Sequence, residues 1–189
     1  MKTFKFLFIF LIIFLSLTSC KNEKTYISPD LQKNGLYGNV SMVINKYDTV
    51  IFDIDGQQKK NGDRIVRDEA GYIISWETGT RESENFQMEK YKYDKKYNLI
   101  EIEGEGDWTI YSYVRTYHYN NDGDLIKIDS ECSGYLEDNW KQIQEYTILK
   151  KDRKGNWIKR LCHDQTILSD GSLFSNEEYL EERQIVYID

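Results

Sequence analysis

Histidine, cysteine and proline are scarce in this chain of 189 residues, which has two histidines, three cysteines and one proline. No two cysteines form a CxxC pair, so a structural zinc site is not expected. The sequence also lacks a glycine-rich phosphate loop and a dinucleotide fingerprint. No nucleophile elbow or zinc-protease motif accompanies the histidines. We therefore expect no cofactor and no metal.

Positively charged residues are fewer than negatively charged ones. The chain has 25 Lys and Arg residues against 32 Asp and Glu, which gives a formal net charge of −7. Nucleic-acid binding depends on Lys and Arg residues that neutralise phosphates. An acidic chain is poorly suited to this, so we expect no nucleic-acid partner.

Long apolar runs are missing except at the N-terminus. Lys2 and Lys5 are followed by an unbroken apolar run from Phe6 to Leu15. This run is shorter than the roughly 20 residues that a transmembrane helix needs. A basic start, a short apolar run and small residues after it are typical of a signal peptide, which we assign to residues 1–19.

The end of this leader, Leu17-Thr18-Ser19-Cys20, resembles the lipobox of bacterial lipoproteins. The resemblance implies that Cys20 becomes the first mature residue and carries acyl chains such as palmitate, which anchor the protein in a membrane. Lys21 follows Cys20, and by analogy with proteobacterial lipoproteins this favours the outer membrane, facing either the periplasm or the outside. Residues 20–34 include the only proline and no apolar periodicity, so we expect a lipidated cysteine and a flexible tether.

A repeated phrase organises the rest of the chain. It has Asp or Asn first and usually Gly fourth, and an isoleucine follows three residues later. The copies are Asp68-x-x-Gly71, Asp94-x-x-Tyr97, Asn120-x-x-Gly123 and Asp152-x-x-Gly155, with Ile74, Ile100, Ile126 and Ile158. This is the chemistry of a type I turn with a following bulge, so each copy is expected at a hairpin tip. Asp53 to Gly56 resembles a degenerate first copy.

Tyr97 departs from this phrase because tyrosine adopts a positive φ less readily than glycine. We expect Asn98 to take that conformation instead. Between the turns, aromatic and β-branched residues alternate with polar ones, as in Ser112 to Asn120. Residues 136–147 and 175–178 also fit helical spacing, but their β-rich surroundings favour strands. The sequence predicts one all-β domain over residues 35–189, an antiparallel meander of repeated hairpins forming an open curved sheet or partial barrel.

Two copies carry a family resemblance. Tyr91-x-Tyr93-Asp94-x-x-Tyr97-Asn98-Leu99-Ile100 and Tyr117-x-Tyr119-Asn120-x-x-Gly123-Asp124-Leu125-Ile126 resemble the tyrosine-aspartate (YD) repeats of the RHS type. With the lipobox, the chain is similar to small lipoproteins of Bacteroidota built from such repeats. The resemblance implies an open antiparallel meander and leaves function open.

The tyrosines give the first candidate site. Six of them could form an aromatic platform for sugar rings or partner side chains, namely Tyr91, Tyr93, Tyr111, Tyr113, Tyr117 and Tyr119. The alternative, which the repeat favours, is cross-strand packing between the tyrosines and the repeat isoleucines.

Other candidates have stronger structural explanations. Cys132 and Cys162 could form a disulfide in an exported protein, but spacing alone leaves the pairing open. Glu101, Glu103 and Glu105 share a strand face that is best explained as solvated surface. Asp53-x-Asp55-Gly56 and Asn120-x-Asp122-Gly123-Asp124 lack the remaining calcium ligands and are better explained as turns.

His118 and His163 are the only histidines, and surface or structural roles are favoured for both. Our leading hypothesis is a non-enzymatic, lipid-anchored cell-envelope protein that presents a β-sheet surface to a glycan or an envelope protein. One alternative is an envelope hydrolase that uses carboxylates such as Glu101 or Asp107. Another, implied only by the RHS resemblance, is an immunity or accessory protein of a secreted toxin system.

Overall fold

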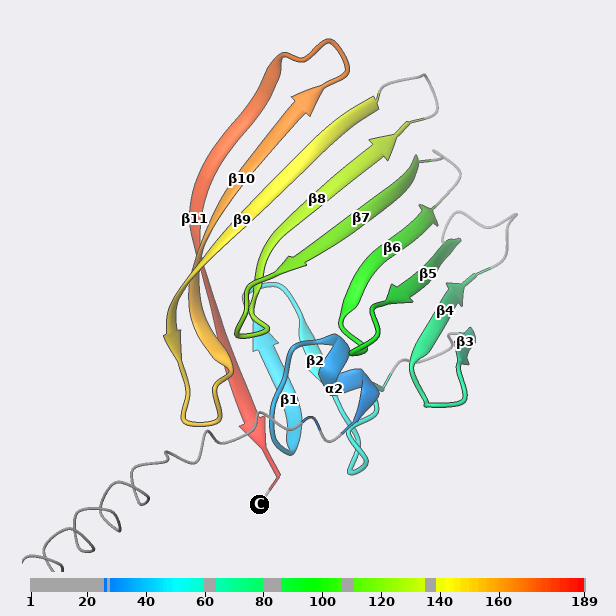
Figure 1. Ribbon diagram of the computed structural model, residues 1–189, viewed down its shortest axis with the longest axis vertical. Coiled ribbons are helices and arrows are strands. Elements are labelled where there is room, and N and C mark those ends of the chain that lie inside the picture. Colours follow the sequence, from blue (N-terminus) through cyan, green and yellow to red (C-terminus); the bar gives the residue numbers. More distant parts are fainter. Residues whose placement is uncertain are drawn as a thin grey trace, which may run out of the picture.

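The protein forms one antiparallel sheet of eleven strands, in the order β2-β1-β11-β10-β9-β8-β7-β6-β5-β4-β3 (Figure 1). The computed structural model describes residues 26, 28–59, 64–79, 86–106, 111–134 and 139–188. The strands are β1 (Val40–Asn45), β2 (Thr49–Ile51), β3 (Arg64–Arg67), β4 (Ile73–Thr78), β5 (Gln87–Tyr93), β6 (Leu99–Gly106), β7 (Tyr111–Tyr119), β8 (Leu125–Ser133), β9 (Asn139–Lys151), β10 (Trp157–Leu168) and β11 (Leu173–Tyr187). The sheet is curved and does not close, which confirms the predicted fold class (Figure 1).

Strands β3 to β11 follow each other as a meander, but the N-terminal hairpin breaks this order. Strand β1 pairs with the C-terminal strand β11, with Val43 opposite Ile185. Strand β2 pairs with β1 and forms one edge of the sheet, while β3 forms the other. The two regions in which the sequence fits helical spacing lie in β9 and β11 as far as they are described, so the preference for strands is confirmed.

The repeated phrases lie at hairpin tips, as predicted. At the first tip the Gly71 amide donates to the Asp68 carbonyl, and the Asp68 carboxylate accepts from the Ala70 amide. Gly71, Gly123 and Gly155 all adopt positive φ. The degenerate copy forms the same turn, with Gly56 at φ 73°. A further tip at Leu168 to Gly171 was not predicted, because it begins with leucine.

The expectation for Asn98 was wrong, because Tyr97 itself adopts the positive φ, at 61°. The turn requires this conformation at its fourth position, where the Tyr97 amide donates to the Asp94 carbonyl. The Tyr97 ring stacks on Tyr72, with 4.2 Å between centroids, which stabilises the strained residue. The side-chain amide of Asn98 instead donates from Nδ2 to Asp94 Oδ2 at 2.9 Å.

The predicted tether over residues 20–34 was wrong from Ser28 onward. Ser28 Oγ accepts from the Leu31 amide and caps a one-turn helix, α2 (Pro29–Lys33), which begins with proline at a favourable position. Leu31 is 0% exposed and packs in an apolar cluster with Leu36, Val40, Val43 and Phe52. A helix of one turn is too short to show apolar periodicity, which is why it was not predicted.

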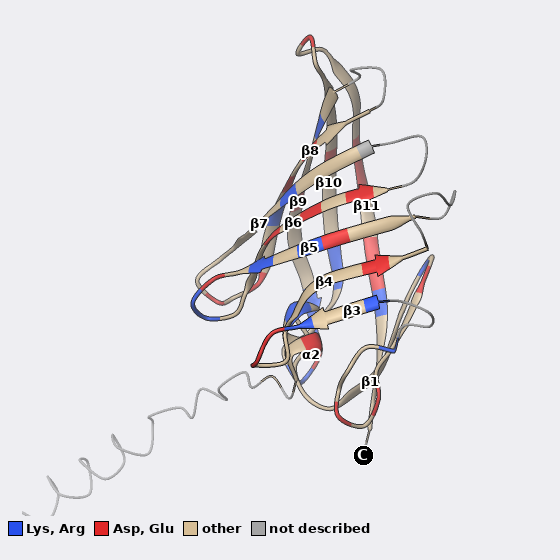
Figure 2. Ribbon diagram, turned by 90° about the vertical axis from the view of Figure 1, so that its right-hand side faces the viewer, with Lys and Arg blue, Asp and Glu red and all other residues tan. Residues whose placement is uncertain are grey.

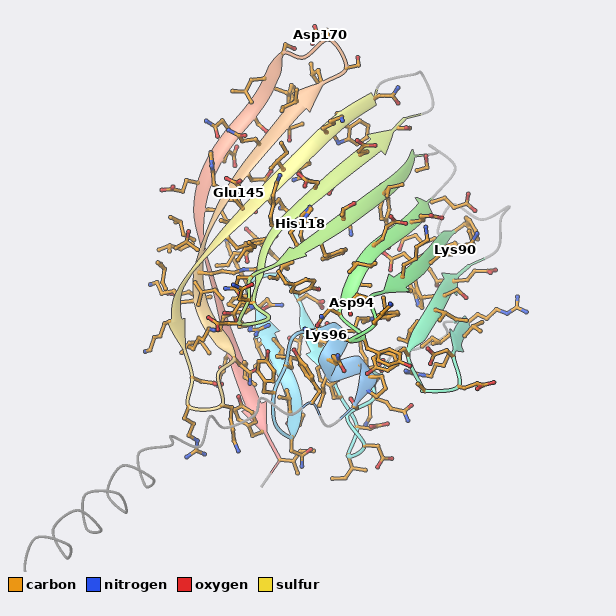
Figure 3. All side chains as sticks on the ribbon, in the orientation of Figure 1. Lys90, Asp94, Lys96, His118, Glu145 and Asp170 are labelled. Carbon is orange, nitrogen blue, oxygen red and sulfur yellow. The ribbon has the colours of Figure 1, made fainter. Side chains whose placement is uncertain are left out.

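The N-terminal segment, residues 28–37, contacts the tips of the repeated hairpins. At the first tip, the Asp30 carboxylate forms a bidentate ion pair with Arg67, at 2.8 and 2.9 Å. At the second tip, Gln32 Nε2 donates to the Lys96 carbonyl at 2.8 Å. Figure 3 shows Asp94 and Lys96 beside α2, at the opposite end of the sheet from Asp170.

The same segment continues to the third and fourth tips. The Tyr37 hydroxyl lies against Gly123. Asn156 Oδ1 accepts from the Tyr37 amide at 2.7 Å, and Asn156 Nδ2 donates to the Tyr37 carbonyl at 2.9 Å. All four tips are therefore joined by one stretch of chain that is remote from them in sequence.

The sheet has an inner face, on which Tyr91, Tyr113 and Tyr117 pack, and an outer face, on which the intervening residues lie. The second apolar cluster is on the inner face and contains Ile73, Tyr91, Leu99 and Ile102. The prediction that the tyrosines pack on the repeat isoleucines was wrong, because Ile74, Ile100 and Ile126 are 37–40% exposed on the outer face. Alternation along each strand directs the neighbouring Ile73 and Leu99 inward instead.

Charged residues of both signs are spread along the strands (Figure 2). No helix within the described residues combines the length and apolar character that a membrane span requires. Residues 1–19 and Cys20, predicted as signal peptide and lipidation site, lie outside the described residues.

Candidate functional site

The tyrosines proposed as a platform are mostly built into the inner face. The hydroxyls of Tyr91 and Tyr113 each donate to a different oxygen of the Glu89 carboxylate. The hydroxyls of Tyr93 and Tyr119 donate to the backbone carbonyls of Ile73 and Leu99, both at 2.8 Å. Tyr117 packs against the second cluster, and the side chain of Tyr111 lies outside the described residues. These contacts support packing, and ligand binding by these rings remains a prediction.

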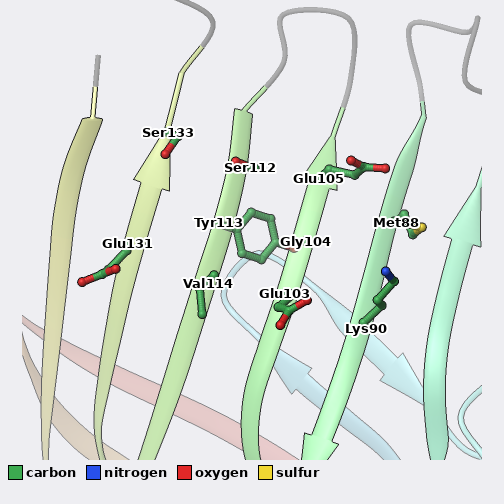
Figure 4. Close-up of a pocket in the computed structure, with 10 residues that line it drawn as sticks. All are labelled: Met88, Lys90, Glu103, Gly104, Glu105, Ser112, Tyr113, Val114, Glu131 and Ser133. Atoms are coloured by element: carbon green, nitrogen blue, oxygen red, sulfur yellow. The ribbon is translucent and has the colours of Figure 1, made fainter. Parts of the chain in front are cut away.

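Tyr113 also fills the space above a glycine. A Cβ at Gly104 would lie 2.2 Å from the Tyr113 ring, which therefore rests directly on the opposite strand (Figure 4). The Arg115 guanidinium lies 4.3 Å from the centroid of the Tyr113 ring. The Tyr113 side chain therefore contacts Gly104, the Glu89 carboxylate and the Arg115 guanidinium.

The glutamates of β6 lie on the outer face. Glu101 and Glu103 both accept from Lys92 Nζ, which confirms that they share a face. The bond to Lys92 lowers the pKa of Glu103, which favours its ionised form and makes it a poor general acid. Asp107, the other carboxylate named for a hydrolase, lies outside the described residues. Glu103 and Glu105 line a shallow hollow with a volume of about 350 Å³, and both are labelled in Figure 4.

The two histidines are also partly exposed on the outer face. His118 Nε2 lies 2.8 Å from Asp129 Oδ2, and His163 Nε2 lies 2.6 Å from Asn176 Oδ1 (Figure 3 shows His118). Burial tends to raise the pKa of Asp129, but Lys127 and His118 outweigh it and the pKa is lowered. Each histidine thus has a partner on a neighbouring strand, as expected of a structural role.

The possible disulfide is not formed, because Cys132 and Cys162 are both free thiols. Cys132 is in β8 and Cys162 is in β10, and β9 lies between them. Two strand spacings place β8 and β10 about 9.6 Å apart, and the cysteines are also offset along β9, because Cys132 lies opposite Trp140 and Cys162 opposite Tyr146. A disulfide needs Cα atoms within about 6.8 Å. Their positions in successive repeats suggested proximity, but the repeat is one hairpin of two strands.

In the two segments that resembled calcium loops, the first side chain accepts hydrogen bonds from backbone amides of its own turn. Asp53 Oδ1 accepts from the amides of Asp55 and Gln57, and Asn120 Oδ1 accepts from those of Asp122 and Asp124. Within the part of the chain that the structure describes, no three His, Cys, Asp or Glu side chains form a group that could hold a metal ion.

A hollow at β10 and β11, which we call the β10–β11 pocket, was not predicted from the sequence. It has a volume of about 690 Å³ and lies between strands β10 and β11 and the turn at Asn45 to Asp48. Its lining includes Trp157, Arg160, Tyr179 and Arg183. The sequence offered only an indirect signal, the six extra residues between the third and fourth turns, which lengthen the strands here.

Arginines cover the ring of Trp157 in this pocket and the ring of Tyr146 next to it. The guanidinium groups of Arg160 and Arg183 lie 4.2 and 3.8 Å from the centroid of the Trp157 ring. Arg160 also lies 3.7 Å from the centroid of Tyr146 and pairs with Glu181. At Trp157 the pocket therefore presents stacked cations more than a bare ring face.

Arg183 is the most deeply placed of these cations. Burial, and then the nearby Arg160, lower its pKa to about 9. Its Nε donates to the Trp157 carbonyl at 2.7 Å. Its Nη2 is buried and has no hydrogen-bond partner among the described residues. The hydrogen bond from Arg183 therefore fixes the position of Trp157, while the unpaired Nη2 of Arg183 lowers the stability of the fold.

A polar cluster adjoins the pocket on the inner face. The Asp164 carboxylate accepts hydrogen bonds from Gln142 Nε2 and Gln144 Nε2, at 2.8 to 3.0 Å. The Tyr146 hydroxyl donates to Gln144 Oε1 at 3.1 Å. The longest strands thus carry a polar inner face, in contrast to the apolar cluster under β4 to β6.

Comparison of the sequence with protein-family models gives no match, and comparison with curated proteins gives none either. The functional argument therefore depends on the geometry of the molecule.

Proposed function

We propose that the protein is a non-enzymatic, lipid-anchored protein of the cell envelope, and that it binds a partner protein at the β10–β11 pocket. The observation that carries this proposal is the composition of the pocket, where Trp157, Arg160 and Tyr179 converge on a hollow of about 690 Å³. Tyr47, in the turn at its rim, is 86% exposed. Tryptophan, tyrosine and arginine are the residues most enriched at the energetic centres of protein interfaces.

Because arginines cover the rings of Trp157 and Tyr146, a protein ligand is favoured over a sugar that stacks on an aromatic ring. A glycan platform needs an open aromatic face, but Trp157 lies between two guanidinium groups and Arg160 lies over Tyr146. The lining also contains charged side chains from the turn and from β11, such as Lys46, Asp48 and Glu181, and non-obligate protein interfaces likewise have a polar rim. A glycan is the second candidate, favoured by the Gln142, Gln144 and Asp164 cluster, whose amide and carboxylate groups could bond to sugar hydroxyls.

The lipid anchor is supported by the sequence around Cys20. Acyl chains contribute about 0.8 kcal/mol of membrane binding for each buried methylene, so several chains would hold the protein at the membrane firmly. Metabolic labelling with a palmitate analogue should mark the natural protein and should fail to mark a Cys20→Ser variant. Labelling of the variant would contradict the anchor without affecting the pocket.

A binding screen tests the proposed function. The soluble domain from Asn22 onward would be screened against glycans and purified envelope proteins. We expect a protein ligand whose binding falls about tenfold or more in a Tyr47→Ala/Tyr179→Ser variant, because interface tyrosines are often worth 1.4 kcal/mol or more. A Leu149→Ala variant is the control, since Leu149 is exposed on the outer face. Equal binding by all three proteins would contradict the pocket as the site.

A further inference from the structure

The C-terminal strand has an open edge over most of its length. Strand β1 covers β11 only from Arg183, which lies opposite Asn45, to Tyr187. Residues 173–182 pair with β10 on one side and with no described strand on the other (Figure 1). The other two edges of the sheet, β2 and β3, are much shorter. A long open edge can accept a further strand through its backbone groups.

The direction of the open backbone groups follows from the pairing with β1. The Ile188 amide donates to the Asn39 carbonyl on the β1 side at 2.8 Å. Successive residues of a strand direct their N–H and C=O groups to opposite sides, and the register of β11 is continuous from 175 to 187. Glu178, Leu180 and Glu182 therefore present their backbone groups to the open side.

The side chains along this edge have a regular pattern. The sequence Glu177-Glu178-Tyr179-Leu180-Glu181-Glu182 places two acidic residues on each side of two apolar ones. Side chains alternate between the two faces of a strand. Each face of this edge therefore carries an acidic, then an apolar, then an acidic side chain. Tyr179 and Leu180, at the centre, are 37% and 54% exposed.

This pattern disfavours a second copy of the chain as the added strand. Antiparallel pairing of two such edges about Leu180, the central residue with open backbone groups, would place Glu178 of each copy opposite Glu182 of the other. Like charges directly opposite each other destabilise a strand pair. Within the chain, Glu181 pairs with Arg160 and Glu182 with Lys159, and the described residues give Glu177 and Glu178 no such cation.

We infer that the open edge of β11 binds a basic extended segment of the partner protein as an added strand. The segment has two basic residues, two apolar residues and two basic residues, so that both of its faces complement the edge. It lies in line with β1 and ends against the turn at Asn45 to Asp48, beside the β10–β11 pocket. This inference rests on the proposed partner binding and specifies the chemistry of the partner.

The test uses the full-length protein in detergent and two labelled octapeptides that differ only in charge. One peptide contains Lys-Lys-Val-Val-Lys-Lys and the other contains Glu-Glu-Val-Val-Glu-Glu, each flanked by threonines. We expect the basic peptide to bind about tenfold or more tightly, since several cross-strand charge pairs change sign together. Its affinity should fall as salt is added.

Two variants separate charge from backbone pairing. A Glu177→Lys/Glu178→Lys variant should lose preference for the basic peptide and gain affinity for the acidic one. A Leu180→Pro variant should bind neither, because it removes an N–H from the open side only. Its melting curve and β-sheet circular dichroism show whether the β10–β11 pairing persists. If it unfolds, a basic peptide N-methylated at alternate residues replaces it, and this peptide should not bind the natural protein.

Other results would overturn the inference. Equal binding of the two peptides, or none, would show that the edge does not select a basic strand. A dimer that the Leu180→Pro or Glu177→Lys/Glu178→Lys change dissolves would show that a second copy occupies the edge. If Tyr47→Ala/Tyr179→Ser impairs partner binding but neither edge change does, the pocket stands as the binding site and the strand addition is refuted.

Discussion

The side chain of Asn156 hydrogen-bonds both backbone groups of Tyr37, a residue 119 positions earlier in the chain. Asn156 is 1% exposed, and its Nδ2 also lies 2.7 Å from the Tyr187 hydroxyl. One amide therefore joins the last repeated hairpin tip, the N-terminal segment and the C-terminal strand.

Asn156→Ala should lower the free energy of unfolding by about 2–3 kcal/mol, because it leaves buried polar groups of Tyr37 unpaired. Urea unfolding followed by circular dichroism measures this. Asn98→Ala is a matched control at the corresponding position of another tip, where the amide bonds only Asp94 within its own turn. We expect the control to lose less than about 1 kcal/mol. Equal losses would contradict a special role for Asn156.

Asp30→Asn should also destabilise the protein, by about 2–4 kcal/mol, because it removes one partner of a largely buried ion pair and leaves the Arg67 charge uncompensated. Asp30 is 1% exposed, and its Oδ2 also accepts from the Gln58 amide. Limited proteolysis should then cut the N-terminal segment faster than β9 to β11. Unchanged proteolysis near Pro29 would show that the ion pair does not hold this segment.

Tyr97 allows backbone strain to be separated from ring stacking. Tyr97→Ala keeps the positive φ and loses the stack on Tyr72, whereas Tyr97→Gly loses the stack but removes the strain. We therefore expect the glycine variant to be more stable than the alanine variant by about 1 kcal/mol, the cost of left-handed backbone for a residue with a Cβ. Thermal unfolding of the pair measures the difference. Equal stability of the two variants would show that the positive φ at position 97 does not strain a residue with a Cβ.

Gly104→Ala should destabilise the protein by about 1–3 kcal/mol, because the new methyl group would overlap the Tyr113 ring. In a Tyr113→Ala background the same change should cost little. A double-mutant cycle gives the coupling between the two positions. Coupling near zero would mean that the ring does not rest on the glycine.

The protein should lose stability in alkaline solution. Burial raises the pKa of Tyr91, Tyr93, Tyr119 and Tyr146 above the ordinary value of 10.0, and it raises that of Tyr187 to about 12. The unfolded chain therefore loses these protons at lower pH than the folded one. The contribution is complete below pH 10 and declines as the pH rises through the folded values. The tyrosinate absorbance of these five residues should appear only together with unfolding, in addition to that of the exposed tyrosines. The full absorbance change of all tyrosines near pH 10 in the folded state would contradict this.

Local chemistry made much of the fold predictable. Asp68 and Gly71 determine a turn by contacts within four residues, and Tyr117 and Tyr119 alternate with the polar Thr116 and His118 as a strand with two faces requires. The open antiparallel meander followed from the repetition of such units. These features depend on neighbours in sequence, which a single chain displays directly.

Long-range contacts were not predictable in the same way. Nothing near Asp30 indicates that its partner is Arg67, and nothing near Val43 indicates pairing with Ile185. The β10–β11 pocket likewise combines Tyr47 with Trp157 and Tyr179 through the crossing of β1 to the far end of the sheet. The candidate site was missed because it depends on this crossing.

Site-specific photocrosslinking in cells tests the central claim, that the protein binds a partner at the β10–β11 pocket and its edge. A photoreactive amino acid would replace Tyr47 or Leu180 in the full-length protein, or Leu149 on the outer face as the control. We predict that positions 47 and 180 crosslink to one and the same protein, through a basic segment identified by mass spectrometry, and that position 149 does not. Crosslinking to that protein from position 149 alone, or from all three positions alike, would contradict the account.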